Sequence, residues 1–201
     1  MRVPRAVDWN VDGKMDLLVG AGGYVWLYLN IGSVTVPAFA PAVKIQAAGS
    51  DIYAGTTSNN PFTLADMTGD GVADLVMADS ASKLRIYRNT SAAGATPVYA
   101  ASTFIKKSDG TTDLLLPDKR FDIGDWNGDG KPDLITGNFS GNVLLYLNAN
   151  TAAAPRYETS SVVDGESYNY YPRFCDLGLN GQTDLVRGIN WGDVKYWLNV
   201  P

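Results

Sequence analysis

Three segments of the sequence carry aspartates at positions 1, 5 and 9, with asparagine or threonine at position 3 and glycine at position 6. They span residues 8–16, 66–74 and 125–133. Carboxylates crowded in this way repel one another, and without a cation their pKa values rise. Calcium binds about six to eight oxygen ligands, which a flexible carboxylate loop can supply, whereas magnesium is seldom held by an all-protein cage. The spacing therefore predicts three calcium sites.

The position in each loop predicts the role of each ligand. Positions 1, 3 and 5 are spaced as in the first half of an EF-hand, but no glutamate follows at position 12. The aspartate at position 9 is therefore expected to close the site as a bidentate ligand, and position 7 is expected to offer its backbone carbonyl. The predicted ligands are Asp8, Asn10, Asp12, Lys14 and Asp16; Asp66, Thr68, Asp70, Val72 and Asp74; and Asp125, Asn127, Asp129, Lys131 and Asp133.

A fourth segment, residues 176–184, is a weaker copy. Its position 3 is Gly178, which has no side-chain oxygen, and its position 5 is the neutral Asn180. The alternative for every copy is an Asx-turn, because aspartate, asparagine and glycine favour turns without any metal. Three near-identical copies that retain all carboxylates favour calcium, whereas for the fourth copy both calcium and a metal-free turn remain alternatives. Its candidate ligands are Asp176, Asn180, Gln182 and Asp184.

The loops belong to a sequence repeat. Their first aspartates follow one another at intervals of 58, 59 and 51 residues, so four units fill the 201-residue chain. Each loop is preceded by one strand-like run and followed by two more, rich in β-branched and aromatic residues, such as residues 25–30. A Pro-aromatic segment opens a further run in the first three units. Each unit therefore resembles four short antiparallel strands, and its length suits a propeller blade.

We expect an all-β fold, a β-propeller of four-stranded antiparallel blades that forms a single domain over residues 1–201. The repeats lie approximately at 1–57, 58–116, 117–167 and 168–201. No Pro-aromatic segment follows the fourth unit, so the last blade is expected to lack its outer strand. Three arrangements stay open: a four-bladed ring with one short blade, a piece of a larger propeller, or a half-ring that closes by pairing with a second copy. Open blade edges disfavour the half-ring as a monomer.

The motif Asp-x-Asn-x-Asp-Gly-x-x-Asp-Leu, followed by a Gly-rich turn and a Tyr-rich strand, resembles the FG-GAP/VCBS repeat. That repeat builds the propeller of integrin α subunits, of certain calcium-containing mushroom lectins and of many secreted bacterial proteins. The resemblance covers essentially the whole chain. It implies calcium bound through positions 1, 3, 5, 7 and 9 of each loop, between the first two strands of a blade. Propellers of this family usually have seven or eight blades, so four repeats depart from the family pattern.

The composition disfavours several classes of function. The chain has no histidine, which removes Ser-His-Asp and Cys-His nucleophile systems and histidine-ligated zinc. The single Cys175 excludes an internal disulfide and a thiolate zinc cluster. The net charge of −5 argues against a nucleic-acid partner, and no apolar run approaches the ~20 residues of a membrane span. Most carboxylates that could act as an acid–base pair lie in the calcium loops, so an enzyme is not expected.

We therefore expect a non-catalytic, calcium-stabilised recognition or adhesion module, lectin-like, for carbohydrate or an extracellular protein. The alternatives are a structural propeller fragment that completes a ring as a homo-oligomer and, less favoured, a polysaccharide lyase. Loops of this kind suit a millimolar calcium supply, so a secreted or cell-surface protein is expected, with its signal peptide outside this chain. The candidate ligand contacts, which could equally fill blade interfaces, are Tyr53, Tyr168, Asn169, Tyr170, Tyr171 and Trp191.

Overall fold

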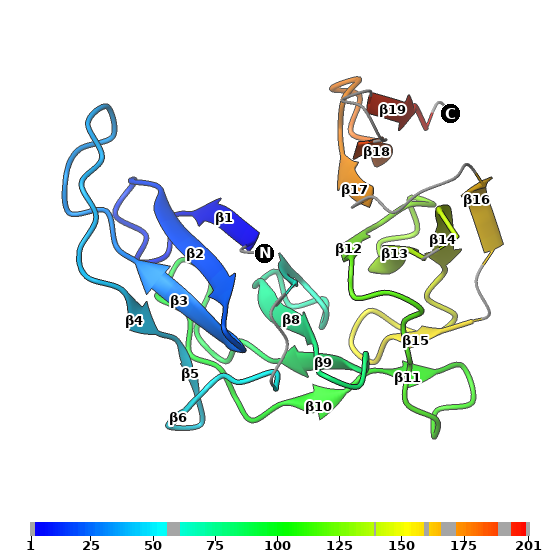
Figure 1. Ribbon diagram of the computed structural model, residues 1–201, viewed down its shortest axis with the longest axis horizontal. Coiled ribbons are helices and arrows are strands. Elements are labelled where there is room, and N and C mark those ends of the chain that lie inside the picture. Colours follow the sequence, from blue (N-terminus) through cyan, green and yellow to red (C-terminus); the bar gives the residue numbers. More distant parts are fainter. Residues whose placement is uncertain are drawn as a thin grey trace.

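The computed structural model describes residues 3–55, 61–138, 140–158, 161–165, 172–188 and 194–199. Over these ranges the regular structure consists of β-strands without helices, and none of it could cross a membrane as an apolar helix. Four small antiparallel sheets form a four-bladed β-propeller (Figure 1). The all-β propeller expected from the repeats is confirmed.

Each blade runs from an inner strand outward. The strands of the first blade are β1 (Val3–Val7), β2 (Asp16–Ala21), β3 (Tyr24–Tyr28) and β4 (Val43–Lys44). Those of the second are β7 (Phe62–Ala65), β8 (Asp74–Ala78), β9 (Leu84–Tyr87) and β10 (Thr103–Phe104). Those of the third are β12 (Phe121–Gly124), β13 (Asp133–Gly137), β14 (Asn142–Tyr146) and β16 (Ser161–Gly165). Those of the fourth are β17 (Pro172–Cys175), β18 (Asp184–Gly188) and β19 (Val194–Trp197).

The fourth sheet has three strands within the described ranges, as expected for a blade without its outer strand. Every acidic loop connects the first and second strands of its blade. The Pro-aromatic segments do not themselves form the outer strands of the blades. Their aromatic residues instead make bridges to the asparagines that follow the third strands, and in each case the outer strand begins a few residues later. The bridged pairs are Asn30–Phe39, Asn89–Tyr99 and Asn148–Tyr157.

Two small elements lie outside the four sheets. β5 (Gln46–Ala47) and β6 (Ser50–Asp51) form a hairpin beyond the first blade. β11 (Lys106–Lys107) of the second unit pairs in parallel with β15 (Arg156–Tyr157) of the third. The parallel pair therefore joins two blades through backbone hydrogen bonds.

The core lies between successive blades. Alternation along β3 buries Val25 and Leu27, which are 0% and 6% exposed, against residues of the second blade such as Phe62. A second cluster joins the second and third blades in the same way, and a smaller one around Leu185 joins the third and fourth. Each fully buried aliphatic or aromatic side chain contributes about 1.5–3 kcal/mol. Blade-to-blade packing is therefore what holds the propeller together.

The inner strands meet near the middle of the molecule (Figure 1). The residue three places before each acidic loop lies on this inner strand, and these four positions are Arg5, Thr63, Asp122 and Arg173. The Thr63 hydroxyl donates to Asp122 Oδ1 at 2.9 Å, and Arg173 Nη1 lies 3.3 Å from the same oxygen. Arg5 also contacts this carboxylate. All four blades thus converge on one buried acid.

Candidate functional site

The four acidic loops share one backbone conformation. The glycine at position 6 has a left-handed φ in every copy, between +77° and +81°, a conformation that glycine adopts without a steric cost. Position 4 is left-handed too. It is glycine in the second and third loops but Val11 in the first, with φ 58°, and Leu179 in the fourth, with φ 51°. The first and fourth loops therefore hold a strained residue where the others have glycine.

The aspartate at position 1 caps its own loop. In the second loop Asp66 Oδ1 accepts the N–H groups of Gly69 at 2.7 Å and Asp70 at 3.2 Å, while Oδ2 accepts that of Gly71 at 2.8 Å. The equivalent bond to the position 6 glycine occurs in all four copies. Burial opposes ionisation of Asp66, but these backbone donors outweigh it and hold its pKa below the usual value. The position 1 contacts are those of an Asx-turn.

The aspartate at position 5 accepts the N–H of position 7, and in two loops it also pairs with the position 7 lysine. Lys14 Nζ lies 3.0 Å from Asp12 Oδ2, and Lys131 Nζ lies 2.7 Å from Asp129 Oδ2. The hydrogen bond from Lys131 lowers the pKa of Asp129. The sequence suggested only the backbone carbonyl of position 7 as a ligand, and it did not anticipate this side-chain ion pair.

The aspartate at position 9 is buried in every loop, at 0–1% exposed. One of its oxygens accepts the N–H of loop position 2, and the other accepts the N–H of the asparagine that follows the third strand. In the third loop these bonds run from Trp126 at 3.1 Å and Asn148 at 2.8 Å to Asp133. Position 9 therefore ties the start of the loop to the end of the third strand, a structural role beyond the metal-ligand role expected from the sequence.

The asparagines after the third strands were missed as site residues. In the first blade the Asn30 side-chain oxygen accepts the N–H groups of Gly32 at 3.0 Å and Ala38 at 3.1 Å, which shapes the following loop. The last of them, Asn199, donates from Nδ2 to the Trp126 carbonyl of the third blade at 2.6 Å. The sequence does contain the signal, because an asparagine ends this run in all four repeats.

Like charges strain the second and third loops. Burial raises the pKa of Asp74, and the nearby charges of Asp70 and Asp66 raise it further. Burial likewise raises the pKa of Asp133, and the charge of Asp129 adds to the effect. These two loops therefore hold a carboxylate whose ionised form is disfavoured first by burial and further by the charges of its neighbours.

The fourth loop differs in its electrostatics. The backbone N–H of Asn199 and those of Gly178 and Leu177 lower the pKa of Asp184, although burial opposes them. Position 5 of this loop is the neutral Asn180, so one source of repulsion is missing. The fourth loop therefore has the least need of a cation to stabilise its charges.

The donor chemistry fits a hard cation, although the side chains are not arranged around one. In the part of the chain that the structure describes, no three His, Cys, Asp or Glu side chains group closely enough to hold a metal as they stand. The loops nevertheless concentrate carboxylate and amide oxygens, the ligands that calcium prefers. In the second loop the Thr68 hydroxyl oxygen, at position 3, is buried and has no hydrogen-bond partner among the described residues. Calcium binding stays a prediction, and the second loop fits it best.

Of the candidate ligand-contact residues, the structure describes Tyr53. Its side chain is 44% exposed, and its ring packs against Tyr24 with the ring centroids 4.8 Å apart. Gly23 allows this packing, because a Cβ there would lie 2.2 Å from the Tyr53 ring. The other five candidates, which lie outside the described residues, are Tyr168, Asn169, Tyr170, Tyr171 and Trp191.

Two pockets occupy equivalent positions between successive blades. Each is lined by position 2 of an acidic loop, by the outer strand of the same blade and by the Pro-aromatic segment of the next. The pocket between the first and second blades has a volume of about 430 Å³, and that between the second and third about 330 Å³. Strand register fixes the equivalence, because Val43 lies opposite Leu27 as Thr103 lies opposite Ile86. The repeat thus produces a repeated pocket.

A family model described as FG-GAP-like repeat matches residues 8–77 and 125–187, more than half of the chain. The chain belongs to the FG-GAP-like repeat family. The two matched ranges contain all four acidic loops, so the resemblance noted from the aspartate spacing is confirmed.

Two relatives of this FG-GAP-like repeat protein extend the comparison. Integrin alpha-4 of Xenopus laevis is 36% identical over 81 residues, which make up 36% of this chain and 8% of the integrin. A solved structure of an Agrocybe aegerita lectin, described as specifically recognising non-reducing terminal N-acetylglucosamine, superposes with a TM-score of 0.58 at 21% identity. The superposition covers 98% of this chain and 49% of the lectin, so it establishes the fold over about half the lectin's length.

Proposed function

We propose that this propeller is a non-catalytic recognition module for carbohydrate, with its blades stabilised by calcium. The observation that carries the proposal is the pocket repeated between successive blades, each with position 2 of an acidic loop in its lining. Ligand sites are usually concave and combine apolar walls with a few polar groups. Support also comes from the lectin that shares the fold, which is described as recognising a terminal sugar.

Calcium would be held by the side-chain oxygens at positions 1, 3, 5 and 9 of the first three loops and by the position 7 carbonyl. Bound there, it would supply positive charge that offsets the repulsion around Asp74 and Asp133. Each loop joins the first two strands of its blade, and in the first two units its residue at position 2 lines the neighbouring pocket. A filled loop would therefore stiffen the wall against which a ligand packs.

Catalysis is not part of the proposal. The chain has no histidine, and the acidic residues of the loops are engaged by backbone N–H groups. An extracellular location agrees with the calcium requirement and with the kinship to an integrin α subunit, and it stays a prediction. The half-ring that closes by pairing with a second copy also stays a prediction.

The proposal is tested on a glycan array with the full chain, once in calcium buffer and once in EDTA. We expect binding to a restricted set of glycans in calcium and weaker binding in EDTA. If the chain binds no glycan in either buffer although a cooperative melting transition shows that it is folded, carbohydrate recognition is excluded. Equal melting temperatures in both buffers would exclude the calcium part alone.

A further inference from the structure

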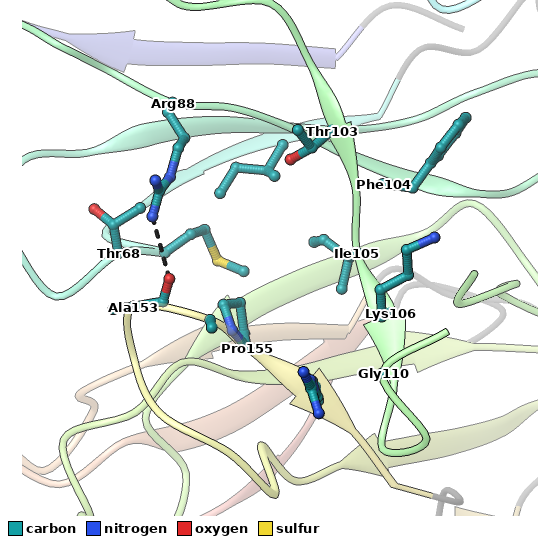
Figure 2. A pocket seen from close by; sticks show the side chains of 13 residues that line it. Thr68, Arg88, Thr103, Phe104, Ile105, Lys106, Gly110, Ala153 and Pro155 are labelled. Atoms are coloured by element: carbon teal, nitrogen blue, oxygen red, sulfur yellow. Dashed lines mark hydrogen bonds between the residues drawn. The ribbon is translucent and has the colours of Figure 1, made fainter. Parts of the chain in front are cut away.

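We propose that the pocket between the second and third blades binds the anionic group of an acidic saccharide, a sugar that carries a carboxylate or a sulfate. The inference rests on the proposed recognition function and adds the chemical class of the ligand. Figure 2 shows the pocket, with Arg88 on one wall and Lys106 on the other. A third cation, Arg156, completes the lining.

The charge of this pocket opposes that of the protein. The chain carries a net charge of −5, yet the residues that line the pocket include three cations and no acid. Cations gathered in a concave site with low-dielectric walls focus a positive potential and attract anionic ligands. The pocket is thus an electropositive site in an acidic protein.

Two of the three cations are not neutralised within the described residues. Arg88 Nη2 donates to the Ala153 carbonyl at 3.1 Å, as Figure 2 shows, but Arg88 forms no ion pair in the part of the chain that is described. Arg156 forms no ion pair there either, and its guanidinium lies over Gly110, where a Cβ would approach to 2.7 Å. Lys106 differs, because Asp113 pairs with it at 2.5 Å. The two arginines are therefore the groups with donors to offer.

Strand pairing places like charges together. Lys106 on β11 and Arg156 on β15 are direct partners in the parallel register that joins the two blades. Like charges directly opposite each other across a strand pair are destabilising. Asp113 offsets the charge of Lys106, so the charge left without a counterion at this pair is that of Arg156, which a bound anion would neutralise.

The equivalent pocket between the first and second blades lacks all three charges. Leu29 occupies the position of Arg88 along the third strand. By the same register, Gln46 corresponds to Lys106 and Val98 to Arg156. The first pocket is lined by one cation, Lys44, which pairs with Asp51 at 2.9 Å. The two pockets therefore keep the same walls, and the repeat itself supplies a less cationic counterpart of the site between the second and third blades.

The rest of the pocket suits a sugar ring. Ile86 and Ile105, which are 7% and 3% exposed, form an apolar floor that can pack against the apolar face of a pyranose. The volume of about 330 Å³ lies at the lower end of the range typical for ligand sites, which is about 300–1,000 Å³. It therefore suits one acidic ring better than a long chain of sugars.

The test compares two sugars that differ only at C6, methyl β-D-glucuronide with a carboxylate there and methyl β-D-glucoside with a hydroxymethyl group, titrated calorimetrically against the full chain in calcium buffer. Glucose 6-sulfate and inorganic sulfate form two further arms. We expect the glucuronide or the sulfated sugar to bind at least about tenfold more tightly than the glucoside, with an affinity that falls as salt is added. Arg88→Leu and Arg156→Val, which introduce the residues of the first pocket, should each remove most of that preference.

The control is Lys107→Gln, which removes one positive charge from the adjacent exposed position of β11. It should leave the preference unchanged, and all variants should keep the melting temperature of the parent chain. Equal affinities for charged and neutral sugars, unaffected by the arginine variants, would overturn the inference while carbohydrate recognition stands. Inorganic sulfate that binds as tightly as either acidic sugar would show that the ring contributes nothing, which also overturns it. A glycan array without any binding would instead refute the proposed function.

Discussion

Arg5 Nη2 in the first blade lies 3.0 Å from Asp122 Oδ1 in the third, although the two residues are 117 positions apart in the sequence. The Asp122 side chain is 6% exposed, and the same oxygen is contacted by Thr63 and Arg173. One carboxylate therefore links inner strands of all four blades. The contact fixes the blades around the axis, in addition to the apolar clusters between neighbours.

Asp122→Ala should destabilise the propeller. The variant leaves two guanidiniums close together without their shared acceptor, so we expect a loss of about 1–3 kcal/mol in the free energy of unfolding. Urea denaturation followed by tryptophan fluorescence measures it. The control is Asp51→Ala, which breaks an exposed ion pair with Lys44 and should hardly move the midpoint. Equal midpoints for the two variants would contradict the role given to Asp122.

Asp70→Asn should have opposite effects with and without calcium. In EDTA it removes a charge that raises the pKa of Asp74, so its melting temperature should equal or slightly exceed that of the parent chain. Saturating calcium at about 100 times Kd should stabilise each intact site by about 2.7 kcal/mol, and the variant should lose that gain for the second loop. Differential scanning calorimetry in both buffers tests this. The fourth repeat already carries asparagine at this position, Asn180.

The pH dependence in EDTA provides an independent check on Asp70→Asn. Because the folded-state pKa of Asp74 is raised, its ionised form costs stability above that pKa, and the cost disappears as the pH falls toward the ordinary aspartate value. Any advantage of the variant at neutral pH should therefore shrink on acidification through that window. An advantage that grows instead would show that repulsion of Asp74 is not the cause.

Asp133→Ala and Asp129→Ala should separate structure from metal binding within one loop. Asp133 is buried and accepts two backbone N–H groups, so in EDTA its loss should cost about 1–3 kcal/mol. Asp129 is exposed, and in EDTA its loss should leave the unfolding midpoint nearly unchanged. In calcium both variants should lose the metal-dependent gain. Denaturant titrations with and without EDTA distinguish these outcomes. A large loss of stability for Asp129→Ala in EDTA would contradict a role for Asp129 in metal binding alone.

Two equivalent tyrosines should respond differently to the loss of a hydroxyl. The Tyr157 hydroxyl donates to the Pro132 carbonyl at 2.9 Å, so Tyr157→Phe should cost about 0.5–1.5 kcal/mol. The Tyr99 hydroxyl is buried and has no partner among the described residues, since Asn89 Nδ2 donates to the corresponding carbonyl, that of Ala73. Tyr99→Phe should therefore be neutral or stabilising. Thermal denaturation of both variants measures the difference. Equal losses of stability for the two variants would contradict the different roles given to the two hydroxyls.

Val11→Gly should stabilise the first loop. A left-handed φ costs a residue with a Cβ about 1–2 kcal/mol, whereas glycine gives up about 0.5–1 kcal/mol in conformational entropy. We expect a net gain of up to about 1 kcal/mol, measured as the change in urea midpoint. The control is Ala73→Gly, at an exposed position outside the left-handed region, which should lose stability. A loss for Val11→Gly would show that the strain is relieved elsewhere.

Local pattern sufficed to predict the blades. The alternation seen in residues 25–30 and the glycines at loop position 6 are features of a few neighbouring residues, and the structure reproduces both. The role of Asp133 was less visible, because one of the backbone N–H groups that it accepts belongs to Asn148, fifteen residues later. That asparagine recurs in every repeat, so the signal was present in the sequence.

Contacts between blades could not be predicted in this way. The parallel pairing of Lys106 with Arg156 and the meeting of Arg5 with Asp122 depend on how whole sheets are placed. Nothing in the local sequence distinguishes Arg156 from any exposed arginine. The positive charge of the pocket between the second and third blades depends on residues of two repeats and is visible only when both are placed next to each other.

The residues at the axis also limit how the repeats can be exchanged. The four corresponding inner positions carry a cation, a hydroxyl, an acid and a cation. A chain assembled from four copies of the third unit would bring four carboxylates to the same point, and one assembled from the first would bring four guanidiniums. Each repeat is therefore suited to its own place in the propeller, and shuffling the repeats would be expected to yield misassembled propellers even though every blade could form.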